Sequence, residues 1–527
     1  MAPHKKLVKD LSNQHALTVI VPVPDEKIEG LRALLNAIGQ NIANPGSPGA
    51  GSVKLERVRD YLPPSQAIPH GGKFIEFGRL TTVHFLRWVL LEPARDAAGG
   101  PIAASLAFST DYDGPFEAHV NELVLVAEPA LRTIYSFCDP PPRHESLQAY
   151  LSAHMRQEAA FYRGHPGRST QQILTVDNRS EEELRLVLEL ELDRVPAPAS
   201  AAPSIILERL RQATGRSRWK SAPSSGRPPD IATRMLLLVG LAGLTLLAML
   251  YGVGTHLFEW IPARVLFTVS VPLVAFAFLA AVLNLLDRIE HRREQRLVER
   301  EGPPAQVDGS IDPLVADRSD VRLRIVTELE DRGPLVQNQM THVVNVKPGM
   351  FRLALLRGVL ATGNFLTHTL FVRGTLVGIP TIHFARWVLI DDNRRLLFFS
   401  NYDFSWESYL GDFIDQASDG LTGVWCNTTF FPRARIHIVT GLVRLTVLVL
   451  RFLPWFSWLP AVRVFAGGAR REQEFKRWTR DHQVPTQVWY SAYPRLSVTN
   501  VNGNTEIAHG LFMPLTGDAQ ADWLRRL

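Results

Sequence analysis

The fold of this chain is decided by a strand that occurs twice. Residues 82–93 read TVHFLRWVLLEP and residues 381–392 read TIHFARWVLIDD. A histidine, an arginine and a tryptophan recur with the same spacing in both stretches. Two apolar stretches this similar, about three hundred residues apart, predict an internal repeat of a buried β-strand.

The match continues downstream of both strands. Corresponding pairs are Tyr112 with Tyr402, Asp113 with Asp403, Glu117 with Glu407, Leu131 with Leu421, and His165 with His482. Each copy is expected to run β-α-β-β-α-β, the ferredoxin-like order, with its fourth strand at 131–138 or 421–428. The expected fold class is α+β, with tandem duplicated ferredoxin-like (split βαβ) domains and an inserted two-helix transmembrane hairpin. Paired copies could bury their free sheet faces against each other, within one chain or in a homodimer.

Two uncharged apolar runs, 235–253 and 265–286, separate the copies. Each is long enough to cross the roughly 30 Å of a bilayer core as a helix. Arginines are frequent outside both runs, whereas the connector carries only Arg264. Because positive residues stay on the cytoplasmic side, we expect a two-pass protein of the bacterial inner membrane with both termini cytoplasmic.

These segments predict the domain organisation of the chain. It comprises a first ferredoxin-like copy over 1–180, a linker with a short helical stretch over 181–234, the hairpin over 235–286, a linker over 287–334, the second copy over 335–510 and a tail over 511–527. The second copy carries an insertion, 435–465, in which basic residues share one helical stripe. We expect this insertion to lie on the membrane surface through Arg444, Arg451, Trp455 and Trp458; a core helix between domains is the alternative.

Composition excludes several classes of function. A net charge of +5 over 527 residues gives no argument for nucleic-acid binding, so the bilayer is the expected partner. The two cysteines have no metal-ligand spacing, and no metal site is predicted. The sequence contains no Gly-rich phosphate loop, nucleophile elbow or HExxH motif.

The repeated polar residues are the candidates for a site. The catalytic candidates are His383, Arg386, Tyr402 and Asp403, and the ligand-binding candidates are His84, Arg87, Trp88, Trp387 and His482. A histidine beside a tryptophan suits a haem ligand or a proton shuttle. The alternative is structural: a buried histidine bonded to backbone, and aspartates that accept hydrogen bonds from the helices directly following them.

The stretch IHFARWVLIDDNRRLLFFSNYDFSWESYLGDFID, with HQVPTQVWYSAYP, resembles a group of largely uncharacterised bacterial proteins. Tandem ferredoxin-like halves are also similar to the dimeric α+β superfamily of chlorite dismutases and dye-decolourising peroxidases. That resemblance implies a haem cofactor in one half, although the Gly-x-x-Asp-Gly loop of the peroxidases is not intact here.

Two functions follow as expectations. In the first, the paired domains bind haem or a small hydrophobic ligand and run peroxidase-like chemistry on lipid-derived substrates. In the second, the chain is a non-catalytic membrane scaffold or lipid-interaction protein.

Overall fold

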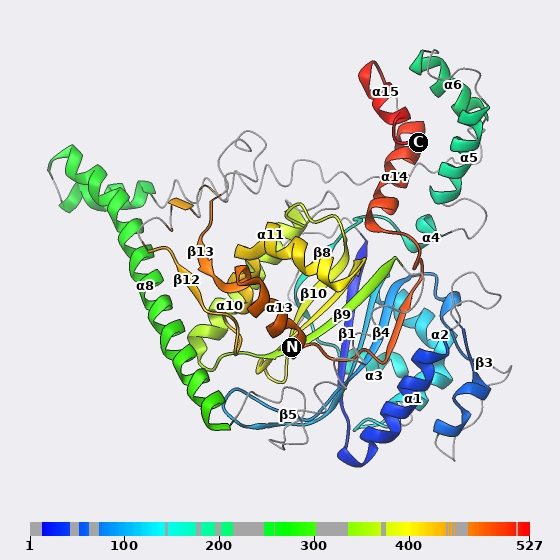
Figure 1. Cartoon of the computed structure of the whole chain (residues 1–527), viewed down its shortest axis with the longest axis horizontal. Helices are drawn as coiled ribbons and strands as arrows, with labels where there is room; N and C mark the ends of the chain where they lie inside the picture. The colour runs from blue at the N-terminus through cyan, green and yellow to red at the C-terminus, as the bar shows by residue number, and fades with distance from the viewer. Residues whose placement is uncertain are drawn as a thin grey trace.

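The structure is a computed structural model of the chain. It describes residues 13–42, 52–62, 73–142, 146–174, 181–194, 202–213, 247–257, 259–301, 336–369, 376–438, 441, 443–444, 447, 462–512 and 515–527. The chain is a mixed α+β protein, and two four-stranded antiparallel sheets form its centre (Figure 1).

The two central sheets have corresponding strand orders. The first sheet runs β1 (Gln14–Pro22), β7 (Ser105–Asp113), β4 (Val83–Leu91) and β14 (Val488–Ser491). The second sheet runs β9 (Gln337–Asn345), β11 (Arg395–Asp403), β10 (Ile382–Ile390) and β8 (Glu158–Arg163). Each sheet therefore places the repeated strand, β4 or β10, next to a strand that comes from the other half of the sequence.

Strands β8 and β14, each at the edge of a sheet, are exchanged between the two halves of the chain. Strand β8 pairs antiparallel with β10, with Tyr162 opposite Ala385. Strand β14 pairs antiparallel with β4, with Tyr490 opposite Leu86. Neither half completes its own sheet, so the two halves fold as one body.

The prediction of strands at 131–138 and 421–428 is wrong, because both ranges are mostly helical. Helix α2 (Phe116–Tyr135) covers most of the first range, and α11 (Trp406–Trp425) covers most of the second. In α2, Leu131, Ile134 and Tyr135 are fully buried at the i, i+3, i+4 spacing of a helix face, which outweighs their strand propensity. The exchanged strands β14 and β8 complete the two sheets instead, each beside the repeated strand, β4 or β10.

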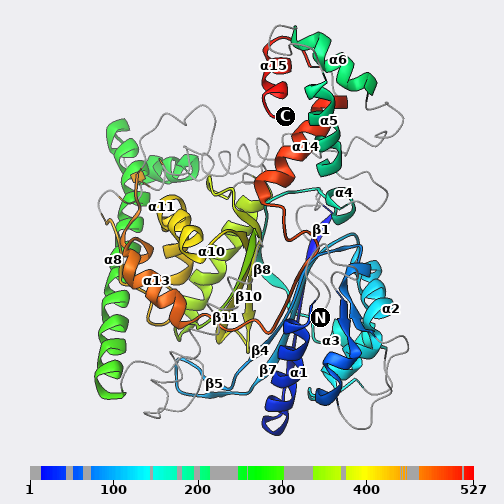
Figure 2. The same cartoon turned by 45° about the vertical axis from the view of Figure 1, so that its right-hand side comes forward.

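Helices cover the outer face of each sheet. The first sheet packs against α1 (Ile28–Gln40), α2 and α3 (Leu147–Ala153), around a core that includes Trp88 and Phe108. The second packs against α10 (Met350–Thr369), α11 and α13 (Glu472–Asp481), around Trp387 and Phe398. The inner faces of the two sheets meet each other through a separate set of apolar residues (Figure 2).

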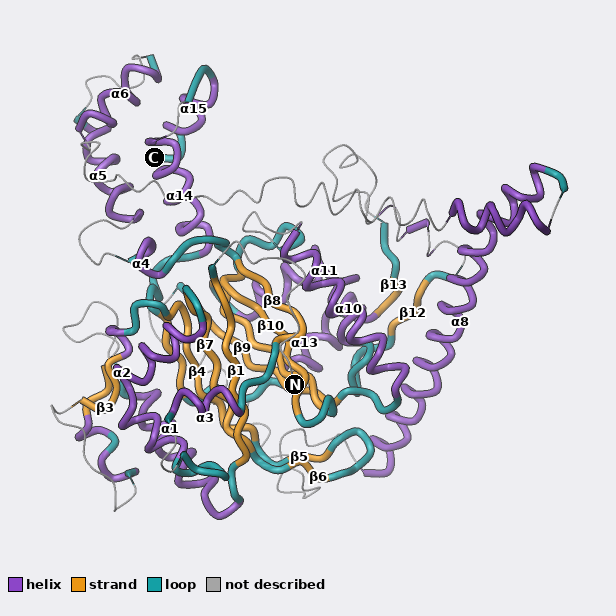
Figure 3. Tube along the Cα trace, turned by 180° about the vertical axis from the view of Figure 1, so that it is seen from behind, coloured by secondary structure: helices purple, strands orange, loops and turns teal. Residues whose placement is uncertain are grey.

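One helix in the described part of the chain is long and apolar enough to cross a membrane, judged by length and composition. This helix is α8 (Ile261–Glu301), whereas a shorter apolar helix spans Leu247–Leu257. Residues 235–246 of the first predicted span lie outside the described residues. Helix α8 runs along one side of the molecule, next to the small hairpin of β12 (Ala434–Ile436) and β13 (Phe465–Gly467) (Figure 3).

A helical cluster stands apart from the sheets. It contains α5 (Glu181–Asp193), α6 (Pro203–Ala213), α14 (Val498–Phe512) and α15 (Asp518–Leu524), which pack around Leu188, Leu207, Leu511 and Trp523. The predicted linker after 181 and the predicted tail after 511 thus contain helices that pack together. The remaining short elements are β2 (Ser52–Lys54), β3 (Lys73–Glu76), β5 (Ala94–Arg95), β6 (Pro101–Ile102) and α4 (Thr170–Ile173).

Candidate functional site

The two repeated histidines sit on β-bulges. Val83 pairs with Tyr112 while Phe85 pairs with Asp111, so His84 is an extra residue in its strand. His383 is the extra residue at the corresponding place in β10. Simple alternation along a strand would place His383 on the same face as Ala385 and Trp387, but these two belong to the outer core. The bulge re-aims the histidine toward the inner side of the sheet.

Each histidine pairs with an aspartate of the neighbouring strand. His84 Nε2 lies 2.9 Å from Asp113 Oδ1, and His383 Nε2 lies 2.7 Å from Asp403 Oδ1. The second carboxylate oxygens accept the backbone N–H of Thr170 and Val498, the first residues of α4 and α14. The aspartates therefore bind helices that follow the exchanged strands. The expectation that they bind the helices directly after them is wrong; Ser405 caps α11.

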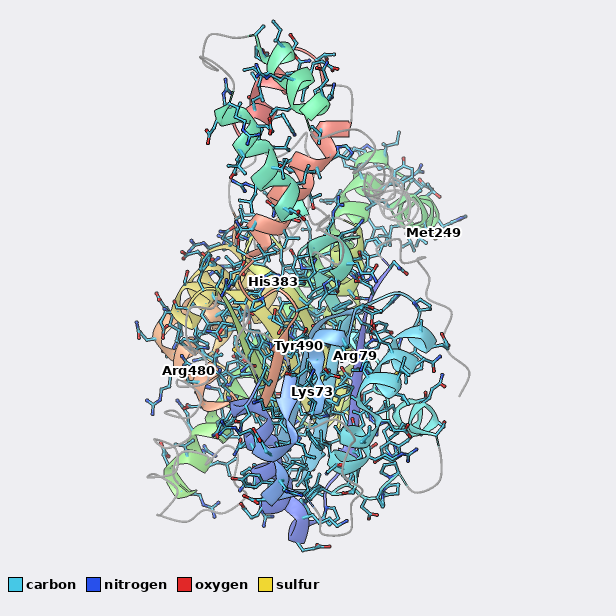
Figure 4. The ribbon with its side chains drawn as sticks, turned by 90° about the vertical axis from the view of Figure 1, so that its right-hand side faces the viewer. Lys73, Arg79, Met249, His383, Arg480 and Tyr490 are labelled. Carbon is cyan, nitrogen blue, oxygen red and sulfur yellow. The ribbon has the colours of Figure 1, made fainter. Side chains whose placement is uncertain are left out.

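A histidine and a tyrosine from the exchanged strands connect the two pairs. The segment 162–166, at the end of β8, reads YRGHP, and 490–494, at the end of β14, reads YSAYP, so His165 corresponds to Tyr493. The predicted correspondence of His165 with His482 is wrong. The Tyr493 hydroxyl lies 2.8 Å from His84 Nδ1 and 3.2 Å from His165 Nε2, and His165 Nε2 lies 3.4 Å from His383 Nδ1. Figure 4 shows His383 in the interior of the molecule.

The result is a continuous polar chain that joins the halves, which we call the histidine chain. Its members, in order, are Asp113, His84, Tyr493, His165, His383 and Asp403. The three histidines are fully buried. Burial lowers the pKa of His165 well below its ordinary value, and the neighbouring His84 and His383 lower it further. Burial also raises the pKa of Tyr493 well above its ordinary value, so His165 and the phenol are both neutral at neutral pH.

The hydrogen-bond donors of the histidine chain all find acceptors in the following arrangement. Each histidine donates from Nε2: His84 to Asp113, His383 to Asp403 and His165 to His383 Nδ1. His84 Nδ1 then accepts from the Tyr493 hydroxyl, and His165 Nδ1 faces the Gln14 amide nitrogen at 3.5 Å. Every buried donor on the three imidazoles has an acceptor in this arrangement, as buried polar groups require.

Two buried arginines cross between the sheets next to the histidine chain. Arg87, on the first sheet, donates to Met340 O and Ser400 O at 3.0 Å each, and also to Asn401 Oδ1. Arg386, on the second sheet, makes the corresponding bonds in the opposite direction. Its acceptors are Leu17 O at 2.8 Å, Thr110 O at 3.0 Å and Asp111 Oδ1 at 2.5 Å.

The hydrogen bonds of Arg87 and those of Arg386 differ in one acceptor. Asp111, which accepts from Arg386, occupies the position that corresponds to Asn401, which accepts from Arg87. Arg386 thus has a carboxylate, whereas the side-chain and backbone acceptors of Arg87 are neutral. The Asn401 amide donates to Asp111 Oδ2 at 2.9 Å and links the crossings. Burial lowers the pKa of Arg87 to about 9, against the attraction of Asp111. The Arg87 guanidinium is therefore charged at neutral pH. Asp111 faces both guanidiniums; burial raises its pKa, and the two arginines lower it.

The structure places the other candidate residues elsewhere. Trp88, Trp387 and Tyr402 lie in the outer cores, where Tyr402 stacks on Tyr409 with ring centroids 3.8 Å apart. His482 lies beside His342 in another part of the second half, with its Nδ1 atom 2.7 Å from Trp478 O. Arg444 donates to Arg463 O at 3.0 Å. Arg451, Trp455 and Trp458 lie outside the described residues.

Sequence reasoning missed Gln14 and Gln337, which hold the loops after the exchanged strands. Gln14 Nε2 donates to Arg168 O at 2.7 Å, and Gln337 Nε2 donates to Leu496 O at 2.6 Å. Both glutamines begin the first strand of their half. The sequence did contain a signal for these residues. An alignment of the two strand starts would have matched Gln14 with Gln337, and an alignment of YxxHP with YxxYP would have matched His165 with Tyr493.

The residues around His383 do not fit haem. Both of its ring nitrogens are within hydrogen-bonding distance of side chains, and Phe85, Phe161 and Phe384 pack into the same region. A small cavity of about 20 Å³ lies in the outer core of the second half, beside Trp425 and Trp478. Ligand pockets are typically about 300–1,000 Å³. No group of three metal-ligating side chains occurs among the described residues.

Comparisons with protein-family models, curated proteins and solved structures found no match to this chain. The resemblances given by the sequence motifs therefore remain predictions.

The contact between Arg386 and Asp111 predicts that removing the charge of Asp111 lowers the stability of the fold strongly. In Asp111→Asn, Arg386 becomes a buried charge without a carboxylate, and the free energy of unfolding should fall by about 3–5 kcal/mol. Adding Arg386→Met should recover part of that loss, because it removes the unpaired charge. Denaturant unfolding of both variants measures this, with the exposed Asp522→Asn as the control. A cost below about 1 kcal/mol for Asp111→Asn, the range of ordinary surface changes, would contradict the account.

The histidine chain predicts acid sensitivity. Below about pH 6.5 the unfolded chain protonates His165, whereas the folded chain keeps it neutral. The free energy of unfolding should therefore decrease as the pH falls, by about 1.4 kcal/mol per pH unit for this residue. His165→Gln should remove that part of the slope between about pH 6 and pH 5.

The matched control for this measurement is Tyr493→Phe. This change removes a hydroxyl from the same chain but no group that titrates in acid, so it should lower stability and keep the slope. An unchanged slope in His165→Gln would show that the residue is protonated in the folded state.

Proposed function

We propose that the chain is a membrane-anchored, non-catalytic platform, in which two ferredoxin-like halves derived from a duplication form one rigid body on the cytoplasmic side of a two-pass hairpin. The observation that carries this proposal is the continuity of α8, whose apolar half extends from the body and whose charged half is fixed to it. A scaffold needs this arrangement, because it must hold a folded surface at a set position on the bilayer.

The apolar half of α8 supports insertion into a bilayer. Between residues 261 and 285 its large apolar side chains are widely exposed, including Leu266 at 70% and Phe278 at 71%. Exposing such side chains to water is unfavourable, at roughly 25 cal/mol per Å² of apolar surface. This part of the helix rises roughly 37 Å, enough to cross the roughly 30 Å hydrocarbon core.

The charged half of α8 is fixed to the second half of the body. Glu290 accepts from Arg352 Nε at 3.0 Å and lies 3.1 Å from Lys347 Nζ, and both basic side chains are almost completely buried. The backbone N–H of Phe430 donates to Glu294 at 3.0 Å. Charges paired in a partly buried setting hold their geometry better than exposed pairs do. The platform would therefore keep one orientation relative to the helix.

The pseudo-symmetry supports the proposed duplication. Matching strand orders, matching bulges at His84 and His383, and reciprocal arginines are hard to obtain from unrelated halves. In this proposal the polar residues between the sheets are buried to specify how the halves pair. Such a registry role is the best-attested use of buried polar groups.

The Asp–His pairs favour one catalytic alternative: binding of a small hydrophobic ligand with acid–base or peroxidase-like redox chemistry. An aspartate that orients a histidine is a common arrangement in general acid–base catalysis. The free nitrogen of each imidazole faces Tyr493 or His165, however, so a substrate would first have to displace one of these groups.

The proposed topology predicts where cysteines can be labelled. Trp260, 73% exposed in the turn before α8, should lie outside the cytoplasm, whereas the exposed Arg293 should lie inside. A membrane-impermeant maleimide should label Trp260→Cys in intact cells. It should label Arg293→Cys only after lysis, and that variant is the matched control.

The native cysteines give a low background in this assay, because Cys138 is buried and Cys426 is partly buried. Labelling of both variants from the same side would contradict the two-pass anchor.

A further inference from the structure

A group of arginines gathers where α8 leaves its apolar stretch and meets the β12–β13 hairpin. We call this group the arginine junction; it consists of Arg288, Arg292, Arg433 and Arg435. Figures 1 and 3 show β12 alongside α8. Two sets of contacts fix the alignment: Asn284 exchanges hydrogen bonds of 2.9 and 2.8 Å with the backbone of Ile436, and Glu294 accepts from Phe430 N.

These contacts bring the four arginines together. Helix residues 284 and 294 contact 436 and 430 respectively, so the helix segment between them runs alongside 433–435. Arg288 and Arg292 follow Asn284 at intervals of four residues and lie on the same helix face. Arg433 and Arg435 are two residues apart on an extended segment and share a side. Burial lowers the pKa of Arg433, and Arg435, Arg288 and Arg292 lower it further.

The positive charge of the arginine junction is not balanced by the described residues. None of its four arginines forms an ion pair with a described residue. Asp287 is the acidic group that acts on Arg433, and it also lies 3.7 Å from Lys347 Nζ. Other charged groups near this region are His291, Glu294, which accepts from Phe430 N, and Arg471, which pairs with Glu474.

The arginine junction also contains a buried donor that lacks an acceptor. Among the described residues, Arg433 Nε has no hydrogen-bond partner although the atom is buried. A buried N–H without an acceptor is costly and calls for an explanation. An anion at this position would supply the acceptor and the missing negative charge together.

The depth of the arginine junction relative to the bilayer indicates which anion binds there. The apolar run of α8 ends at Leu286, and at 1.5 Å per residue Arg288 and Arg292 follow within roughly 10 Å. The headgroup layer is about 5–8 Å thick on each side, since a bilayer of about 40–45 Å has a core of about 30 Å. Arg288 therefore falls within this layer and Arg292 at its outer edge.

We propose that the arginine junction binds the phosphate of an anionic lipid headgroup. Arg433 donates from Nε, and Arg435, Arg288 and Arg292 supply further charge; planar guanidiniums are well suited to phosphate oxygens. This inference rests on the proposed insertion of α8. Free inorganic phosphate shares the chemistry, but the position at headgroup depth favours the lipid.

The test measures lipid binding by the full chain purified in a neutral detergent. Native mass spectrometry would titrate phosphatidylglycerol against phosphatidylcholine. We expect phosphatidylglycerol to bind at least about tenfold more tightly. Arg433→Gln/Arg435→Gln should weaken its binding about tenfold, the size of one lost charge-assisted hydrogen bond. The matched control, Arg477→Gln/Arg525→Gln, removes the same charge from exposed sites away from α8 and should bind as the parent does.

Two results would overturn the lipid site. One is equal phosphatidylglycerol binding by the Arg433→Gln/Arg435→Gln variant and the parent. The other is complete displacement of the lipid by millimolar inorganic phosphate, which would assign the arginine junction to the free ion. Carbonate extraction of membranes separates this test from the proposed function: release of the parent chain would overturn the anchor itself, whatever the lipid titration shows.

Discussion

The architecture depends on two arginines whose acceptors lie across the interface between the sheets. A guanidinium buried between two sheets is tolerated only when its donors are satisfied. Arg87 finds its acceptors on β9 and β11, and Arg386 finds its acceptors on β1 and β7. Separating the halves would leave both charges without partners. The arginines therefore fix the register of the sheets as well as their association, which apolar contacts alone specify less well.

The strand exchange and the histidine chain add to that constraint. Each exchanged strand is followed two residues later by His165 or Tyr493, which connect the two Asp–His pairs. Each aspartate then accepts from the first amide of the helix that follows the exchanged strand. The pairing of the sheets, the position of the connecting loops and the start of α14 are thereby coupled. In the proposed membrane platform, such rigidity would leave the position of the folded body to be set by α8 alone.

The α+β class and the apolar stretch of α8 could be predicted from the sequence, since they depend on local pattern and composition. The exchange could not be predicted, because β8 and β14 carry the same strand signal whichever half they join. The faces of His84 and His383 were also hidden, since a bulge shifts the alternation and leaves no mark in a single sequence. Gln14 and Gln337 were missed for a related reason: they act on loops that are distant in the chain.

The most direct test of the strand exchange is a pair of engineered disulfides. In this structure Leu86 lies opposite Tyr490, whereas a first half that kept its own strand would place Tyr162 there. Dilute chains carrying Leu86→Cys with Tyr490→Cys should form an intrachain cross-link, detected by mass spectrometry of the linked peptides. Chains carrying Leu86→Cys with Tyr162→Cys should not. The reverse outcome, with the cross-link only in the second pair, would contradict the exchange.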